Sequence, residues 1–149
     1  MKKHIFTIFL MLSSIHPIYA QNRIIQGKVI DEFKLSPRIG AVIIVNDSIE
    51  VGVTGVDGCF QFEYPSPINK LSFHYTEMET ADLQLSDDCN YIELIMVRYP
   101  NYCFMSYRKI NKIRRKRYKN LPKLHQEAYE KGIFQSPEVC YIQEFVEFK

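Results

Sequence analysis

Residues 54–64 read TGVDGCFQFEY, which is a turn signal followed by alternating apolar and polar residues. Gly58 can take the positive φ that a tight turn needs, and Asp57 can hydrogen-bond to its own backbone. Beyond the turn, the apolar Phe60 and Phe62 alternate with polar residues, which indicates a strand with one buried face. We therefore expect a tight turn in which Asp57 and Gly58 have a structural role, followed by a half-buried strand.

The same pattern extends to both sides of this stretch. Short apolar or alternating runs, separated by Gly, Pro, Asn and Asp at regular intervals, fill residues 23–96, as is typical of an all-β sandwich. The continuous β-branched run within residues 41–45 is the kind expected of a strand buried on both faces. The expected strands cover residues 23–30, 41–45, 49–54, 60–64, 71–75, 81–85 and 91–96.

Three motifs in this region together resemble a known domain family. They are Gly27-Lys28-Val29-Ile30-Asp31, Pro37 with Gly40-Ala41-Val42-Ile43-Ile44-Val45, and Thr54-Gly55-Val56-Asp57-Gly58-Cys59-Phe60. In combination they resemble the carboxypeptidase regulatory-like domain, which follows some zinc carboxypeptidases and precedes many TonB-dependent outer-membrane receptors. The resemblance implies a mainly β fold, a seven-stranded transthyretin-like (prealbumin-like) Greek-key sandwich, over residues 21–96. It also implies an accessory or interaction role, because these sandwiches are not the catalytic parts of the proteins that contain them.

Two positions depart from the family pattern. Gly55 stands where the family usually has the first Asp of its turn motif, so this turn has one carboxylate fewer with which to hold a cation. Glu77-Met78 stands where a Gly-aromatic pair often follows the preceding strand, which implies a reshaped loop. We expect the fold to be kept and no metal ion to be bound.

The first 20 residues have the three parts of a cleavable secretory signal peptide. Lys2 and Lys3 supply the positive start, a mostly apolar run from Ile5 to Ile15 follows, and Ala20 is the small residue before the cut. The run is shorter than the roughly 18 apolar residues that span a bilayer. We therefore expect an exported protein that does not span the membrane after cleavage. The resemblance to domains beside outer-membrane receptors further implies the periplasm or outer membrane of a Gram-negative cell, with secretion as an alternative.

Charge divides the remaining sequence into two parts. Residues 21–96 carry 5 Lys and Arg against 12 Asp and Glu, whereas residues 97–149 carry 12 against 5. We expect the second part to be a basic, partly helical extension. Its spacing predicts one helix within residues 101–119 and a second helix over residues 121–131, capped by Asn120.

The basic extension has two interpretations. It either docks on its own acidic domain, or it contacts a separate anionic surface such as lipid head groups, an acidic glycan or another envelope protein. Nucleic acid suits the charge but not the compartment. The residues expected to bind a partner are Arg108, Lys109, Lys112, Arg114, Arg115, Lys116, Arg117 and Lys119.

Four cysteines follow the expected signal peptide, and an even number in an exported protein is compatible with disulfides. Two disulfides, one disulfide and free buried thiols all fit the sequence, and four cysteines allow three connectivities. A bridge from Cys59 or Cys89 to the extension would tie the two parts of the chain together. The candidate disulfide residues are Cys59, Cys89, Cys103 and Cys140.

Histidine, the usual partner of catalytic and zinc sites, is scarce after residue 20. His74 is expected to face solvent on a strand, and His125 is expected on a helix surface. Neither has the paired ligands and nearby glutamate of a zinc carboxypeptidase. We therefore expect no catalytic residue, no cofactor and no metal ligand.

These observations favour a protein that is not an enzyme. The leading hypothesis is an exported interaction or accessory module of the cell envelope, with an envelope protein or anionic surface as its partner. One alternative is a carbohydrate-binding or adhesion module, because the many tyrosines that follow the signal peptide supply aromatic rings that could stack on sugar faces. A second alternative is an uncharacterised hydrolase.

Overall fold

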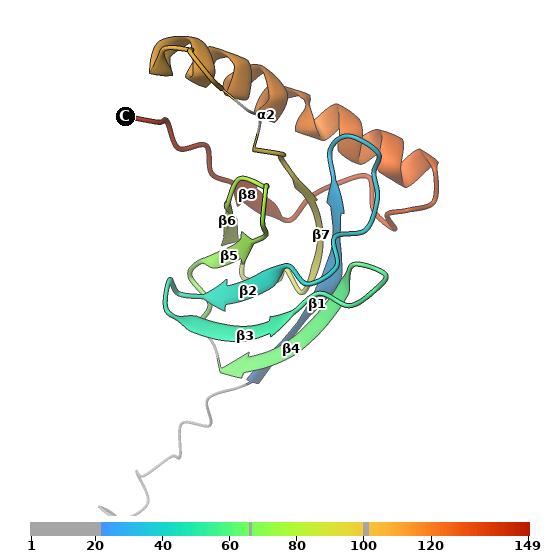
Figure 1. The fold of residues 1–149 in the computed structure, drawn as a ribbon. Helices are drawn as coiled ribbons and strands as arrows, with labels where there is room; N and C mark the ends of the chain where they lie inside the picture. Colours follow the sequence, from blue (N-terminus) through green and yellow to red (C-terminus); the bar gives the residue numbers. More distant parts are fainter. Residues whose placement is uncertain (1–21, 66, 100–101) are drawn as a thin grey trace, which may run out of the picture.

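The structure, a computed structural model, describes residues 22–65, 67–99 and 102–149 of the 149-residue chain. The described part is mainly β, with two sheets and one long helix toward the C-terminal end (Figure 1). The prediction of a mainly β protein with a helical C-terminal extension is confirmed at this level. The predicted signal peptide, residues 1–20, lies outside the described residues.

The first sheet has three strands in the order β4-β1-β7. β1 (Asn22–Asp31) lies in the middle, antiparallel to β4 (Cys59–Pro65) and parallel to β7 (Tyr91–Met96). Gly27 permits the close approach of β1 and β7, because a Cβ at this position would lie 1.8 Å from the carbonyl oxygen of Ile92. Any larger residue at position 27 would push the two strands apart.

The second sheet has five strands in the order β3-β2-β5-β6-β8, and every neighbouring pair is antiparallel. Its strands are β2 (Val42–Val45), β3 (Ile49–Val53), β5 (Leu71–His74), β6 (Ala81–Leu85) and β8 (Tyr141–Gln143). β8 comes from the C-terminal extension and forms one edge of this sheet. The basic part of the chain is therefore built into the same sheet as the acidic part.

The first seven strands lie where the sequence predicts them, with ends that differ by at most one residue. One detail is wrong. β2 was expected to be buried on both faces, yet only Ile43 and Val45 are buried, whereas Val42 and Ile44 are half-buried. The reason is that only the inner face of the second sheet packs on the first, and an antiparallel sheet can leave its other face partly in water.

The turn before β4 depends on the missing side chain of Gly58 and on the carboxylate of Asp57. Gly58 has a φ of +74°, and a Cβ there would lie 2.5 Å from the carbonyl oxygen of Val29. The backbone N–H of Cys59 donates to Asp57 Oδ1 over 3.0 Å. Glycine is thus needed for both conformation and space, and the aspartate closes the turn.

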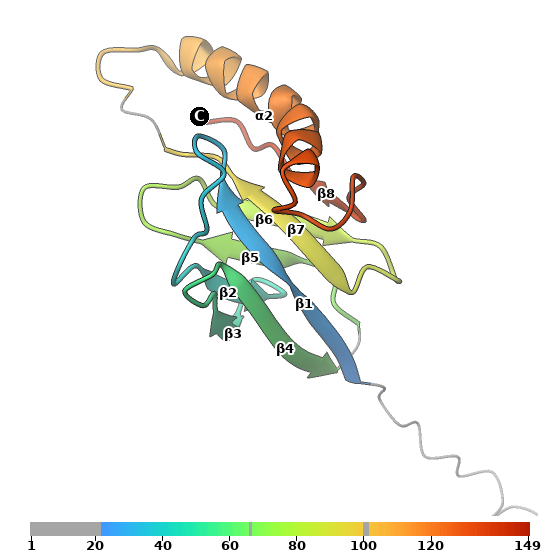
Figure 2. The same ribbon diagram turned by 90° about the vertical axis from the view of Figure 1, so that its right-hand side faces the viewer.

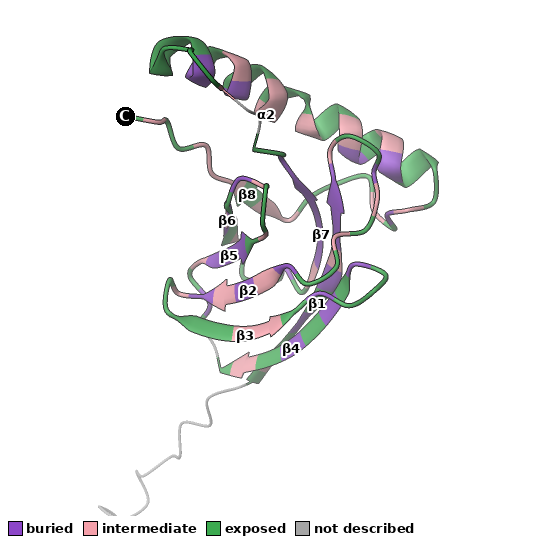
Figure 3. Ribbon diagram, viewed as in Figure 1, coloured by how far each residue is buried: buried purple, intermediate pink, exposed green. Residues whose placement is uncertain are grey.

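Alternating apolar residues of both sheets form one continuous core between them (Figure 3). Phe60 and Phe62 of β4 enter it from the first sheet, and Phe73 of β5 enters it from the second. The rings of Phe60 and Phe73 meet edge to face with centroids 5.2 Å apart. Each fully buried side chain of this size contributes about 1.5–3 kcal/mol, so this core is the main source of stability.

One helix, α2 (Tyr107–Glu130), replaces the two helices expected from the sequence. Asn120 lies inside α2 and is not a cap, and Pro122 lies inside it as well. Proline cannot donate to the carbonyl of Tyr118 and costs a helix about 3 kcal/mol. The helix continues because buried residues before and after Pro122 occupy one face, and their packing outweighs the lost hydrogen bond.

α2 lies over β7 and the end of β1 on the outer face of the first sheet (Figure 2). The outward-facing residues of β4, the other edge strand of this sheet, are exposed. Ile30 of β1 and Ile95 of β7 point away from the main core into a second apolar cluster. Ala128 of α2 and Phe134 after it complete this cluster. The helix therefore has one face that the sheet buries and one face that it leaves exposed.

Among the described residues one disulfide is present, between Cys89 and Cys140, with their Cα atoms 5.3 Å apart. It connects the segment between β6 and β7 to the residue before β8. This is one of the bridges to the extension that the sequence left open. Cys59 is an exposed free thiol, and Cys103 is also exposed.

In the part of the chain that the structure describes, no helix combines the length and the apolar character that a bilayer span requires.

Candidate interaction surface

The basic residues of α2 divide between two faces of the helix. Residues three or four positions apart share a face, because the helix has 3.6 residues per turn. Two of the eight predicted partner-binding cations, Arg114 and Arg117, fall on the face that packs on the protein, and the other six are exposed. The cations on the inner face form ion pairs within the protein, whereas those on the outer face are exposed to solvent.

The Arg114 side chain is buried and makes all of its polar contacts within the protein. It is 3% exposed, and its Nε and Nη2 atoms donate to the two carboxylate oxygens of Glu79 over 2.8 and 2.9 Å. Its Nη1 donates to the carbonyl of Val146 over 2.7 Å, and its guanidinium lies 3.8 Å from the ring centroid of Phe148. A planar cation with this many partners is a structural group and cannot reach an external ligand.

Tyr118 joins the same buried cluster. Its hydroxyl donates to Glu79 Oε2 over 3.1 Å. Burial, reinforced by the negative charge of Glu79, raises the pKa of Tyr118 above its usual value. The phenol therefore stays protonated and serves as a hydrogen-bond donor to the carboxylate.

Arg117 forms the second internal pair, with Glu32 at the end of β1. Its Nε donates to Glu32 Oε2 over 3.1 Å, and its Nη2 contacts Oε1. Glu32 also accepts a hydrogen bond of 2.8 Å from the backbone N–H of Arg98. The interpretation in which the extension docks on its own acidic domain thus describes Arg114 and Arg117.

The opposite side of α2 carries an uninterrupted set of exposed cations, which we call the outer basic face. Its members recur three or four positions apart, and no acidic residue occurs between residues 107 and 126. Among the described residues, Arg115 is the one member with an ion pair, to the half-exposed Glu147. The outer basic face consists of Arg108, Lys109, Lys112, Arg115, Lys116, Lys119 and Lys123.

Lys123 was missed by the sequence analysis. It lies four residues after Lys119 and seven after Lys116, so it shares their face. The expected helix break at Asn120 separated it from the cluster. A continuous helix through Pro122 would have added it.

Exposed apolar side chains lie at the start of α2, beside the first members of the outer basic face. Phe104 is fully exposed, and Tyr107 is more than half exposed. Tyr107 directly precedes Arg108 in the sequence, and Phe104 lies four residues before it. Aromatic rings next to cations are typical of surfaces that meet a lipid head-group layer.

His125 does not lie on the helix surface, contrary to the sequence expectation. It is 4% exposed, its ring centroid lies 4.8 Å from that of Phe134, and its Nε2 donates to the carbonyl of Ser136 over 3.0 Å. Burial lowers its pKa. The prediction was wrong because it placed a helix break at Asn120. Without a continuous helix, the sequence did not show which residues after Asn120 share the buried face. His74 is exposed on β5, as expected.

The other sequence-predicted residues are spread over the molecule. Cys59 is exposed, but partial desolvation of its thiol, with a further contribution from Asp57, raises the pKa of that thiol and so disfavours its reactive thiolate form. In residues 22–65, 67–99 and 102–149, no group of three or more His, Cys, Asp or Glu side chains is arranged to hold a metal ion. The turn of Asp57 and Gly58 lies before β4, whereas the outer basic face lies on the helix that covers β1 and β7.

Comparison with known proteins adds no relative. No protein-family model matches the sequence, and no curated protein matches it. The function of the chain must therefore be argued from the surfaces described above.

Proposed function

We propose that this chain is an exported, non-catalytic interaction module of the cell envelope that binds an anionic surface through the outer basic face. The observation that carries the proposal is the separation of charge on α2. Two arginines are used to attach the helix, whereas seven cations on the opposite side are exposed and one of them is ion-paired within the described residues. Cations that the fold does not use are available to a partner.

We further infer that residues 21–96 form a carboxypeptidase regulatory-like sandwich with transthyretin-like Greek-key topology. Seven strands in two packed sheets, and the glycine turn before β4, support this assignment. In this proposal the sandwich is a rigid support that presents α2. The assignment favours an accessory role over catalysis.

Export is part of the proposal. The charged, apolar and small-residue order of residues 2–20 supports it. The Cys89–Cys140 bridge supports it independently, because disulfides persist in oxidising compartments. A periplasmic or outer-membrane location would place the outer basic face beside anionic lipid head groups and acidic envelope polymers.

The physical basis of binding is long-range attraction. A Lys or Arg close to an anionic membrane contributes about 1 kcal/mol, and the contribution falls off within a Debye length of about 10 Å at 0.1 M salt. Binding should therefore be strong at low ionic strength and weaken as salt is added.

The test is sedimentation of the purified protein with vesicles of phosphatidylglycerol and phosphatidylcholine. The double substitution Lys112→Gln and Lys116→Gln should weaken binding about 30-fold, because two attractive charges are lost. The control, Lys28→Gln with Lys70→Gln, changes the net charge equally, in β1 and directly before β5 and so away from the outer basic face, and should bind like the wild type. The proposal fails if both variants behave alike, or if the wild type does not bind at low salt.

Deletion of the extension would not be a clean test. It would remove β8, the Cys89–Cys140 bridge and the Arg114–Glu79 pair together. The same point variants should instead be used as bait on native envelope. Capture of an envelope protein by the wild type and the control, but not by Lys112→Gln with Lys116→Gln, identifies a protein partner of the outer basic face. If the wild type and the Lys112→Gln with Lys116→Gln variant bind a glycan array equally well, the result supports the carbohydrate-binding alternative.

A further inference from the structure

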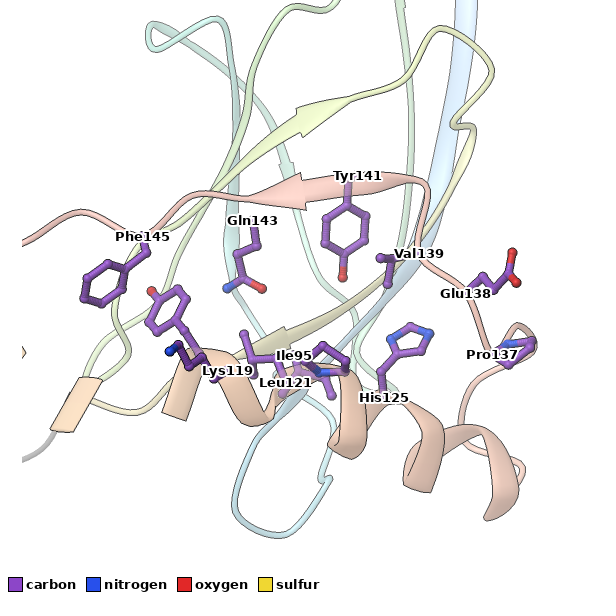
Figure 4. A pocket seen from close by; sticks show the side chains of 12 residues that line it. Ile95, Lys119, Leu121, His125, Pro137, Glu138, Val139, Tyr141, Gln143 and Phe145 are labelled. Atoms are coloured by element: carbon purple, nitrogen blue, oxygen red, sulfur yellow. The ribbon is translucent and has the colours of Figure 1, made fainter. Parts of the chain in front are cut away.

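A cavity of about 660 Å³ lies between α2 and the C-terminal segment that contains β8 (Figure 4). Its walls are mostly apolar, with Leu121 and Pro122 on the helix and Val139 and Phe145 on the facing segment. Its volume falls within the range of about 300–1,000 Å³ that is usual for small-molecule sites. Val139 is 49% exposed, so the cavity opens to solvent.

One end of the cavity carries two hydrogen-bond donors. Gln143 points from β8 toward the helix (Figure 4). Lys119, an exposed member of the outer basic face that also lines this cavity, lies on the helix below it (Figure 4). The Nε2 of Gln143 is shielded from water and has no hydrogen-bond partner among the described residues. Lys119 forms no ion pair with any described residue. A buried donor without an acceptor is costly, and an entering oxygen atom would remove that cost.

The other end of the cavity has the opposite character. His125, Pro137 and Glu138 lie there in Figure 4. The Nε2 of His125 is already engaged with the carbonyl of Ser136, and Glu138 brings a negative charge. An anionic group is therefore favoured at the end of Lys119 and Gln143 and disfavoured at the end of Glu138.

We propose that this cavity binds a small amphiphile with an apolar chain and a terminal carboxylate. The carboxylate accepts hydrogen bonds from Gln143 Nε2, after a small rotation of the terminal amide, and from the ammonium of Lys119. The chain runs along the apolar walls toward His125. Lys119 and His125 are six helix positions apart, which corresponds to about 9 Å along the axis and suits a chain of medium length.

The direct test is calorimetric titration of the purified protein, with its disulfide intact, with decanoate. Saturable one-to-one binding is expected. Octanoate, which buries two fewer methylene groups, should bind about tenfold more weakly. 1-Decanol has the chain without the carboxylate and should also bind about tenfold more weakly, because charge-assisted hydrogen bonds are lost.

Four substitutions separate the parts of the site. Lys119→Gln and Gln143→Leu should each weaken decanoate binding about tenfold and leave decanol binding unchanged. Val139→Trp should fill the cavity and abolish binding of both molecules, without disturbing the core because this side chain is at the surface. Lys112→Gln is the control for Lys119→Gln, since it removes one charge from α2 outside the cavity, and it should bind decanoate like the wild type.

Three results would overturn the proposal. They are the absence of saturable decanoate binding to the wild type, retained binding in Val139→Trp, and an equal loss in Lys112→Gln and Lys119→Gln. Equal affinity for decanol and decanoate would overturn the assigned head group. The cavity proposal and the proposed function can be tested independently of each other. Lys112→Gln with Lys116→Gln should keep decanoate binding, and Val139→Trp should keep vesicle binding.

Discussion

At the scale of single residues, helical position decides what each cation of the basic cluster does. Arg114 and Lys112 are two positions apart and therefore face different directions. Arg114 meets Glu79 and two aromatic rings, whereas Lys112 meets solvent. Neighbouring basic residues of α2 therefore have two roles. Arg114 attaches the helix to the rest of the protein, and Lys112 contributes to an exposed basic surface.

The Arg114–Glu79 pair allows a quantitative prediction. Arg114→Leu should lower the free energy of unfolding by about 3–5 kcal/mol, because Glu79 is left as a buried charge without its partner. The double variant Arg114→Leu with Glu79→Leu should recover most of this loss, since no unpaired charge remains. Urea denaturation of the wild type, of the single variants Arg114→Leu and Glu79→Leu, and of the double variant measures the effect. Additive losses in the double variant would show that the two side chains do not interact.

His125 predicts a pH dependence. Burial lowers its pKa in the folded protein, while the unfolded chain keeps the ordinary value of 6.5. Protons therefore bind the unfolded chain first, so stability is complete above about pH 6.5 and decreases as the pH falls below it. Urea denaturation between pH 7 and pH 5 should show this slope in the wild type and in the control His74→Gln. His125→Gln should flatten it, and an unchanged slope in that variant would contradict the assignment.

At the scale of elements, the C-terminal extension is an integral part of the second sheet. β8 pairs with β6 from Leu83–Gln143 to Leu85–Tyr141, and the hydroxyl of Tyr141 donates to the carbonyl of Glu93 over 2.6 Å. Without β8, the backbone groups of β6 would form an open edge. The extension therefore stabilises the sheet that it joins.

The disulfide should make a large contribution to this arrangement. Cys89 and Cys140 are separated by 51 residues, and closing a loop of that length stabilises a folded chain by about 4 kcal/mol in the chain-entropy treatment. Cys89→Ser with Cys140→Ser should lower the free energy of unfolding by that order, measured with guanidinium chloride. Cys59→Ser changes an exposed free thiol and serves as the control. An equal effect of both substitutions would indicate that the bridge contributes nothing.

At the scale of the whole molecule, two oppositely charged parts combine into one nearly neutral protein. Residues 21–96 have a net charge of −7 and residues 97–149 have a net charge of +7. Internal pairs such as Arg117–Glu32 use part of the positive charge, and the outer basic face displays the rest. The result is a molecule with a strong charge asymmetry despite its small net charge.

If the protein is exported as proposed, its signal peptide should be cleaved and its disulfide should be formed. Protein recovered from the periplasm or medium of the expressing Gram-negative cell should begin at Gln21, because the signal peptide is expected to be cut after Ala20. Intact mass spectrometry should also show the loss of two hydrogens from one disulfide. Ala20→Arg, which removes the small residue before the cut, should leave the precursor uncleaved. A mature protein that still starts at Met1 would contradict export by this route.

Local patterns were sufficient for much of the fold. The alternation of Phe60 and Phe62 with polar residues, and the turn at Gly58, predicted β4 and its start, because strand periodicity and turn conformation are properties of neighbouring residues. The cluster around Lys112 and Lys116 likewise predicted an exposed basic surface. These features require no information about distant parts of the chain.

Tertiary structure decided the features that depend on distant partners. Arg114 is buried because Glu79, 35 residues earlier, lies beneath α2. The helix continues through Pro122 because both halves have partners: Arg114 pairs with Glu79 before the proline, and Ala128 packs in the cluster of Ile30 and Ile95 after it. The Cys89–Cys140 pairing and the cavity beside Gln143 arise in the same way. The sequence alone determined which segments become strands and where charge gathers, whereas packing determined which charges face inward, since the rotation of a helix against a sheet is set by contacts between residues far apart in the chain.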